Sequence, residues 1–348
     1  MSLEVSEESA ARETAPASGA SSRTPPNGPT ARVASWRSLL RTREAALTLL
    51  ILVVTGLLSL AEPTFLTPSN LLSVGTGMIY DLPVAAGMTL VMILGGIDLS
   101  VGAVLGLTGV VTAMGLRSGT PIPVAVLLGF AAAAGVGALN GLLVARFGVA
   151  PFIVTLGTMS IARGAATVLT SGYFLSGLPA AYVAIGRGQV FGIPSPILVV
   201  VALLAALHFL LKRWKPLHDS FYAGHNPAAA SLSGIAVGRL VFAGFVVSAL
   251  LAALSAVFMT SRLAMGYSRF GELAELRAIA ASVLGGASFS GGSGSILGTA
   301  LGVLLLAVIL NGFVLLKFSV YWQGVVSGLI LVVAIAVDAY RRRRNEAR

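Results

Sequence analysis

Cysteine is absent from this chain of 348 residues, and charged side chains are scarce. The lack of cysteine excludes disulfides, thiolate nucleophiles and cysteine-based metal sites. Only 10% of the residues are charged and 56% are hydrophobic, whereas an ordinary soluble domain is about 25% charged. So few solvated groups cannot cover the surface of a water-soluble domain. The composition therefore indicates a membrane protein.

Motifs that carry enzyme chemistry are missing as well. The sequence has no Gly-x-x-x-x-Gly-Lys-Ser/Thr loop to cradle nucleotide phosphates, no nucleophile elbow and no zinc signature. Its three histidines, His208, His218 and His225, do not form a two-histidine metal pair on a helix. We therefore expect no metal site, no catalytic residues and no nucleotide hydrolysis by this chain alone.

The net charge of +10 does not indicate nucleic-acid binding, because the basic residues flank apolar segments. Arg32, Arg37, Arg41 and Arg43 precede the first apolar segment, and residues 341–344 are four consecutive arginines after the last one. Basic residues at segment ends hold those ends in the cytoplasm, and no aromatic-rich basic patch accompanies them. We expect two cytoplasmic termini and no nucleic-acid partner.

Ten apolar segments follow one another through the chain, each close to the ~20 residues that cross ~30 Å of hydrocarbon as a helix. The sequence therefore predicts an all-α, polytopic membrane helix bundle of about ten spans. Glycine-rich breaks within 71–116 and 276–290 indicate broken or re-entrant helices, which would lower the count to as few as eight. The expected segments are 45–61, 71–95, 98–116, 122–145, 151–171, 194–211, 240–261, 276–290, 295–316 and 321–339.

Three regions are expected along the chain. Residues 1–44 are predicted to be a disordered, charged cytoplasmic tail, 45–340 the transmembrane domain, and 341–348 a basic cytoplasmic tail. Ten crossings also place 212–239 in the cytoplasm, in agreement with its basic residues. The segment 262–275 should be external, although it carries two arginines.

Glycines spaced four residues apart recur within the apolar segments, as at Gly102 and Gly106 and at Gly298 and Gly302. Such pairs let helix backbones approach closely in membrane lipid, where no hydrophobic effect drives one helix against another. The first interpretation of these pairs is helix packing. The second is flexibility between two helix arrangements, as a transporter would need.

A few polar side chains within the apolar segments are candidates for a substrate path: Asp98, Ser100, Asn140, Arg163 and Asn311. Asp98 lies in a glycine-broken stretch, so its carboxylate could cap the next helix or line a path. Arg163 lies well inside a segment and must face the bundle or a cavity, because a guanidinium in lipid is costly. Structural pairing and substrate contact both remain open for Arg163.

The segment 212–239 contains a proline turn followed by an alanine-rich stretch that ends at Gly234. This pattern predicts a short exposed helix on the cytoplasmic face, suited to lie in a groove of a partner protein. The candidate contact residues are His225, Asn226, Ala229, Ser233 and Gly234. A simple surface connector is the alternative.

Several stretches, in order, resemble the membrane permeases of ribose-type sugar ABC importers. The similarity covers roughly residues 45–340. A single matching motif would be weak evidence, but five motifs in the same order are strong evidence. The first is Gly95-Gly96-Ile97-Asp98-Leu99-Ser100-Val101-Gly102. The others are 150–164, 186–194, the loop from His225-Asn226 to Gly234-Ile235, and 275–295 with Tyr321-Trp322-Gln323 close behind.

The resemblance implies a permease subunit of the bacterial inner membrane that imports a pentose or hexose by alternating access. It implies a second permease copy, a cytoplasmic ABC ATPase that uses ATP and Mg²⁺, and an extracytoplasmic sugar-binding protein. It also implies that 218–236 docks the ATPase and that Asp98 and Arg163 lie near the path. No cofactor is implied for this chain itself.

This chain departs from the family pattern in two places. Arg277 stands where the family commonly has an acidic or small polar residue, and 171–175 replaces a turn with glycine and proline. These departures leave the substrate open. The alternatives are a related permease for branched-chain amino acids, nucleosides or a signalling furanose, and an ATP-independent carrier.

Overall fold

The computed structural model describes residues 43–319 and 321–346, so nearly all of the predicted tail 1–44 lies outside the described residues. Helices dominate this part of the chain, which confirms the predicted all-α fold. The helices are α2 (Arg43–Ala61), the 3-10 helix η1 (Pro63–Leu66), α3 (Pro68–Ile93), α4 (Val101–Arg117), α5 (Ile122–Phe147), α6 (Pro151–Thr170), α7 (Ala180–Arg187), α8 (Ser195–Arg213), α9 (Lys215–His225), α10 (Pro227–Leu232), α11 (Val237–Leu263), α12 (Ala274–Leu284), α13 (Ile296–Leu315) and α14 (Trp322–Glu346). A hairpin of β1 (Gln189–Val190) and β2 (Ile193–Pro194) precedes α8.

Seven helices are long and apolar enough to cross a membrane: α2, α3, α5, α6, α8, α11 and α13. Helix α4, with 17 residues, and the apolar part of α14, Trp322–Val333, are shorter. The predicted basic tail 341–348 does not begin as a separate segment, because α14 continues through Glu346. The chain is thus a multi-pass membrane protein whose segments include broken helices.

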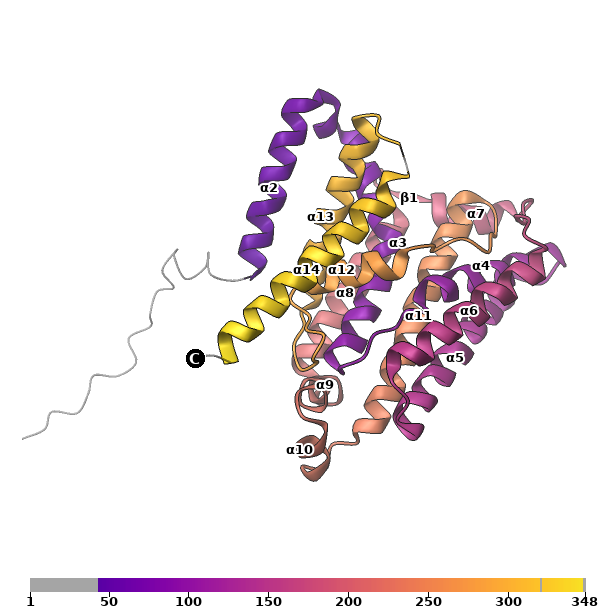
Figure 1. Ribbon diagram of the computed structural model, residues 1–348. Coiled ribbons are helices and arrows are strands. Elements are labelled where there is room, and N and C mark those ends of the chain that lie inside the picture. The colour runs from indigo at the N-terminus through magenta and orange to yellow at the C-terminus, as the bar shows by residue number, and fades with distance from the viewer. Residues whose placement is uncertain (1–42, 320, 347–348) are drawn as a thin grey trace, which may run out of the picture.

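The expected segment 276–290 is not a full helical span. Helix α12 has 11 residues and rises only about 17 Å at ~1.5 Å per residue. It ends before Gly286, whose φ of +104° does not fit a right-handed helix. Non-helical stretches on both sides of α12 complete the passage from the α7 end of the bundle to the α9 end (Figure 1). The chain therefore still crosses here, as a broken helix.

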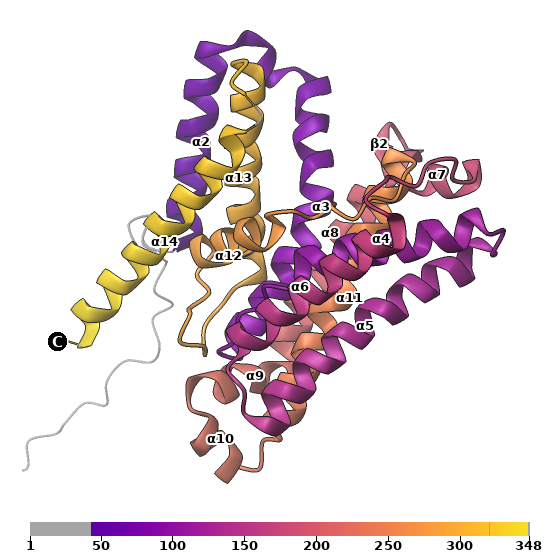
Figure 2. The same ribbon diagram turned by 45° about the vertical axis from the view of Figure 1, so that its right-hand side comes forward.

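Helices α3 and α11 pack against each other at the centre of the bundle. Helix α11 also contacts α4, α5 and α7, whereas α3 contacts α12, α13 and α8. Figure 2 shows the resulting division, with α2, α13 and α14 on one side and α4, α5 and α6 on the other. Helices α9 and α10 lie together at one end of the bundle.

Helix α2 shows what a lipid-facing helix looks like in this chain. It packs on α13 and buries only Leu47 and Ile51. Large apolar side chains, among them Leu52 and Leu57, are more than 60% exposed on its other faces. Such a surface is stable only in an apolar surrounding, so it fits contact with the acyl chains of a membrane.

Candidate functional site

Asp98 lies in the non-helical link between α3 and α4 and is fully buried. Its Oδ1 accepts hydrogen bonds from the backbone N–H of Ser100, at 3.0 Å, and from the Ser100 hydroxyl, at 2.6 Å. Its Oδ2 accepts a hydrogen bond from Ser248 Oγ on α11, at 3.0 Å. The N-cap of α4 is Ser100, so the carboxylate orders the turn that precedes α4 and ties this turn to α11.

The same hydrogen-bond network continues into two further helices. Asn140 Nδ2 on α5 donates to Ser100 Oγ at 2.9 Å, and Thr158 Oγ1 on α6 donates to Asn140 Oδ1 at 2.7 Å. Asp98, Ser100 and Asn140 are each at most 1% exposed. The structure thus brings three of the five path candidates together, in a buried cluster that joins four helices. Their contact with substrate stays a prediction.

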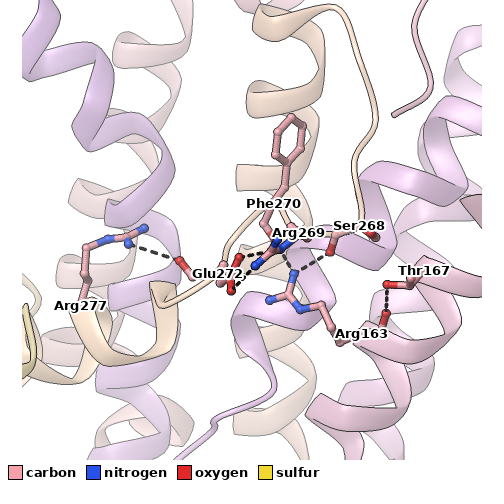
Figure 3. Close-up of polar contacts among 7 residues, drawn as sticks. All are labelled: Arg163, Thr167, Ser268, Arg269, Phe270, Glu272 and Arg277. Carbon is pink, nitrogen blue, oxygen red and sulfur yellow. Dashed lines mark hydrogen bonds and ion pairs between the residues drawn. The ribbon is translucent and has the colours of Figure 1, made fainter. Parts of the chain in front are cut away.

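Arg163 belongs to a different cluster. Its Nη1 donates to the backbone oxygens of Ser268, at 2.6 Å, and Phe270, at 2.8 Å (Figure 3). These bonds attach the 264–273 loop to α6, so structural pairing is the role that the geometry supports. In the same loop, Arg269 forms an exposed ion pair with Glu272 at 3.0 Å. This pairing holds the pKa of Glu272 below its ordinary value.

Gly102 and Gly106 on α4 face the 264–273 loop, and Gly102 also faces Glu275 in the first turn of α12. A Cβ on Gly102 would collide with the backbone oxygen of Gly271 and with Glu275 Oε2, and one on Gly106 would lie 2.6 Å from the backbone oxygen of Ser268. Glu275 Oε2 is buried and has no hydrogen-bond partner among the described residues. The two glycines therefore make room for the 264–273 loop and for the start of α12.

Gly298 and Gly302 do lie at a helix–helix contact. Any side chain at these positions on α13 would collide with backbone atoms of Gly285 and Ala281 at α12. Helices α12 and α13 can therefore approach each other backbone to backbone, as small residues allow in a membrane.

Asn311 stands apart from the other path candidates. Its side-chain amide forms a reciprocal pair with that of Asn70 on α3, through hydrogen bonds of 2.9 and 3.0 Å. Asn70 also donates to the backbone oxygen of Phe65 at 2.8 Å. This amide pair fastens α13 to α3 and η1. The structure therefore does not combine Asn311 with Asp98 or Arg163 into one site.

One charged pair inside the bundle was missed by the sequence analysis. Arg277 on α12 donates to Asp81 on α3, with Nη2 3.0 Å from Oδ1 and Nε 3.2 Å from Oδ2. The two side chains are 24% and 26% exposed. An aspartate in the middle of an apolar segment is the signal that could have found it, because a lone carboxylate at that depth is costly.

The predicted helix in 212–239 is confirmed as α10. The Asn226 side chain caps it by accepting from the Ala229 N–H at 3.0 Å, and Gly234, at φ +82°, turns the chain after it. A groove of about 590 Å³ lies beside it, lined by residues that include His225, Asn226, Ala229, Ser233 and Gly234. All five predicted contact residues therefore share one surface.

This surface is joined to the end of α3 through glycines. A side chain on Gly224, at the end of α9, would collide with the backbone oxygen of Ile93. The same Ile93 oxygen accepts a hydrogen bond from Gly292 N at 2.8 Å. Gly291 packs on Gly95 and Gly224. We call the contact of Gly224, Gly95, Gly291 and Gly292 with Ile93 the glycine junction; it lies a few residues before Asp98.

The chain is similar in sequence to known membrane permeases. The family described as branched-chain amino acid transport system / permease component matches residues 70–335. Ribose import permease protein RbsC of Bacillus subtilis is 40% identical over 292 residues, which are 83% of this chain and 90% of that protein. D-allose transport system permease protein AlsC of Escherichia coli is 34% identical over 83% of this chain and 89% of its own length. Autoinducer 2 import system permease protein LsrC of an Enterobacter species is 32% identical, over 88% and 90%. No solved structure gives a significant match.

Proposed function

The chain belongs to the family of branched-chain amino acid transport system permease components, and we propose that it is the membrane-spanning subunit of an ATP-driven importer for a pentose or hexose. The observation that carries the proposal is the 40% identity to a ribose import permease over 83% of the chain. A relative named for D-allose import supports the same class of substrate. The multi-pass helical fold fits a transport subunit.

The importer would need two kinds of protein partner. A cytoplasmic ABC ATPase would bind and hydrolyse ATP with Mg²⁺, because this chain has no phosphate-binding loop. An extracytoplasmic sugar-binding protein would deliver the substrate. A second copy of the permease would complete the path, and membrane lipid would cover helices such as α2. We place both termini in the cytoplasm of a bacterial cell, on the side of the basic residues.

The surface of α10 and its groove is the proposed docking site for the ATPase. Its residues are exposed on a short capped helix, which is the shape that a groove in a partner can hold. The glycine junction would then carry movement of α9 to the end of α3, and from there to the link that contains Asp98. Alternating access would follow from the resulting shift of α3 against α11.

Two other functions remain as alternatives. The first is a related permease for branched-chain amino acids, nucleosides or a signalling furanose, and the relative named for autoinducer 2 import supports the furanose among them. An ATP-independent carrier is the other alternative. It would take up solute in vesicles that contain the purified chain alone.

Reconstitution tests the proposal directly. The chain is placed in lipid vesicles with its ATPase and binding protein, and uptake of labelled ribose, a hexose and leucine is followed with and without ATP. We expect sugar uptake only with ATP and both partners. Uptake by the chain alone, or uptake of leucine in place of sugars, would contradict the proposal.

The docking surface has its own test. Leucine in place of Gly234 strains a turn that needs positive φ, so Gly234→Leu should reduce co-purification of the ATPase while membrane insertion stays normal. Gly119, which also has positive φ and lies at the end of the bundle opposite α10, gives the matched variant Gly119→Leu. Equal ATPase recovery with both variants would exclude α10 as the docking helix.

A further inference from the structure

The depth of the Asp81–Arg277 pair constrains its surroundings. Asp81 is the fourteenth of the 26 residues of α3, so it lies roughly 20 Å from either end at ~1.5 Å per residue. A helix of this length spans the ~30 Å hydrocarbon layer, which puts the pair near mid-membrane. Charged groups at that depth face the bundle interior or a water-filled cavity, because contact with lipid is costly.

The pair is also accessible. About a quarter of each side chain is exposed on the surface of the single chain, in contrast to Asp98, which is fully buried. The exposed part of an intramembrane ion pair must meet water, substrate or another polar protein surface. Within this chain the pair is therefore not fully enclosed.

The surface of α3 that leads to the pair differs from a lipid-facing surface. Ser69, Ser73 and Gly77 are exposed and spaced four residues apart, so they lie on one face of the helix, next to Asp81. These three positions carry no large apolar side chain, although Leu71 and Leu72 beside them on α3 are 49% and 41% exposed. The outer half of α3 therefore presents a narrow strip of small residues, bordered by leucines, that ends at the ion pair.

From these observations we propose that this strip lines the sugar path and that Asp81 and Arg277 are its specificity-determining contact. The inference rests on the proposed function. A guanidinium and a carboxylate held side by side offer N–H donors and oxygen acceptors at a fixed angle. Of two adjacent sugar hydroxyls, one can accept a hydrogen bond from the guanidinium and the other can donate one to the carboxylate. Because the pair has no net charge, it favours neutral polyhydroxylated solutes.

The absence of cysteine makes the path directly testable. Single variants Ser73→Cys and Gly77→Cys, in the full complex in vesicles, are treated with a membrane-impermeant thiol reagent. A Cβ on Gly77 meets nothing within 4 Å, so this change fits the fold. Leu57→Cys on the exposed face of α2 is the control for a lipid-facing position.

We expect both α3 cysteines to react at least about tenfold faster than the control, since only water-exposed thiols ionise and react. Addition of substrate-loaded binding protein with ATP should change the labelling rate of these cysteines. Labelling no faster than at Leu57→Cys would overturn the proposal. So would full crosslinking of Gly77→Cys between two copies without any labelling, since the strip would then be a packed interface.

The contact itself is tested by Arg277→Lys, which keeps the charge and loses the planar fork. We expect uptake of ribose relative to a hexose to change by about threefold or more, since a point charge cannot replace bidentate contacts. Stimulation of the ATPase by loaded binding protein is measured in the same vesicles, because a merely structural defect would lower it in parallel with uptake. Arg269→Lys, in the exposed pair with Glu272, is the matched control and should leave the sugar ratio unchanged.

An unchanged sugar ratio, or a parallel fall of uptake and ATPase stimulation, would mean that Arg277 is only structural and would overturn the proposal. Failure of the unmodified complex to take up any sugar would instead contradict the proposed function. The two failures are therefore distinguishable in one experiment.

Discussion

Two aspartates in this bundle stand in opposite surroundings. Asp98 is enclosed between four helices and accepts three hydrogen bonds from Ser100 and Ser248. Asp81 pairs with a cationic partner, Arg277, and stays partly exposed. Neutral donors inside a closed cluster hold helices together, whereas an exposed ion pair at membrane depth can exchange partners with a passing solute. Exposure, more than residue type, therefore separates the enclosed carboxylate of Asp98 from that of Asp81, for which we propose a contact with substrate.

The largest loss of stability is expected when the enclosed aspartate, Asp98, is replaced. Asp98→Ala removes the acceptor for three buried donors, each of which costs about 1–3 kcal/mol when left unsatisfied. We expect the free energy of unfolding to fall by roughly 3 kcal/mol or more, measured as a lower thermal midpoint in detergent. A variant as stable as the unmodified chain would show that Asp98 is not a structural residue.

A smaller effect is expected from Asp81→Asn. Removing one charge from a partly exposed pair should cost about 1–2 kcal/mol, between the values for surface and buried ion pairs. Sugar uptake should fall by more than this loss of stability explains, when both are measured on the same preparation. If stability falls as far as in Asp98→Ala, the contrast between the two aspartates does not hold.

The edge of the Asp98 cluster gives a finer test. Thr158→Val keeps the shape of the side chain and removes the donor to Asn140 Oδ1, a bond of 2.7 Å. We expect a loss of about 1 kcal/mol, the net value of one hydrogen bond. Thr167→Val, which removes an exposed hydrogen bond to the backbone of the same helix, is the control and should have little effect on the thermal midpoint.

The smallest effect concerns the exposed loop pair. Arg269 lowers the pKa of Glu272, so the charged form stabilises the folded chain above the ordinary pKa of about 4.3, and this contribution is lost as the pH falls through the lowered value. In the unmodified protein the thermal midpoint should therefore fall slightly below about pH 4. In Glu272→Gln this fall should be smaller. Identical curves for both proteins would show that the pair contributes nothing measurable.

Features set by neighbouring residues could be predicted from the sequence. Helix α10 follows from Asn226 as its cap and from Gly234 as its end, because both act within a few residues of the helix. The apolar segments likewise coincide with helices. The broken α12 was only partly foreseen, since its length depends on the positive φ of Gly286 and on the contact of Gly285 with α13.

Features set by distant residues could not be predicted in the same way. Asp81 and Arg277 are 196 positions apart, and only the fold brings them together. Gly102 and Gly106 have the spacing of a helix-packing pair, yet most of the atoms packed against them belong to the 264–273 loop, with Glu275 of α12 beside Gly102. Spacing identifies a small surface on a helix, but it does not identify what fills that surface.

The glycine junction has a mechanical consequence. At this point α9 and the end of α3 touch through main-chain atoms, with no side chain between them that could change rotamer and absorb a displacement. Main-chain contacts of this kind are hardly compressible, so a displacement of α9 would be passed on to Ile93 directly. Even one added methyl group at Gly224 would act as a wedge and hold the two segments apart.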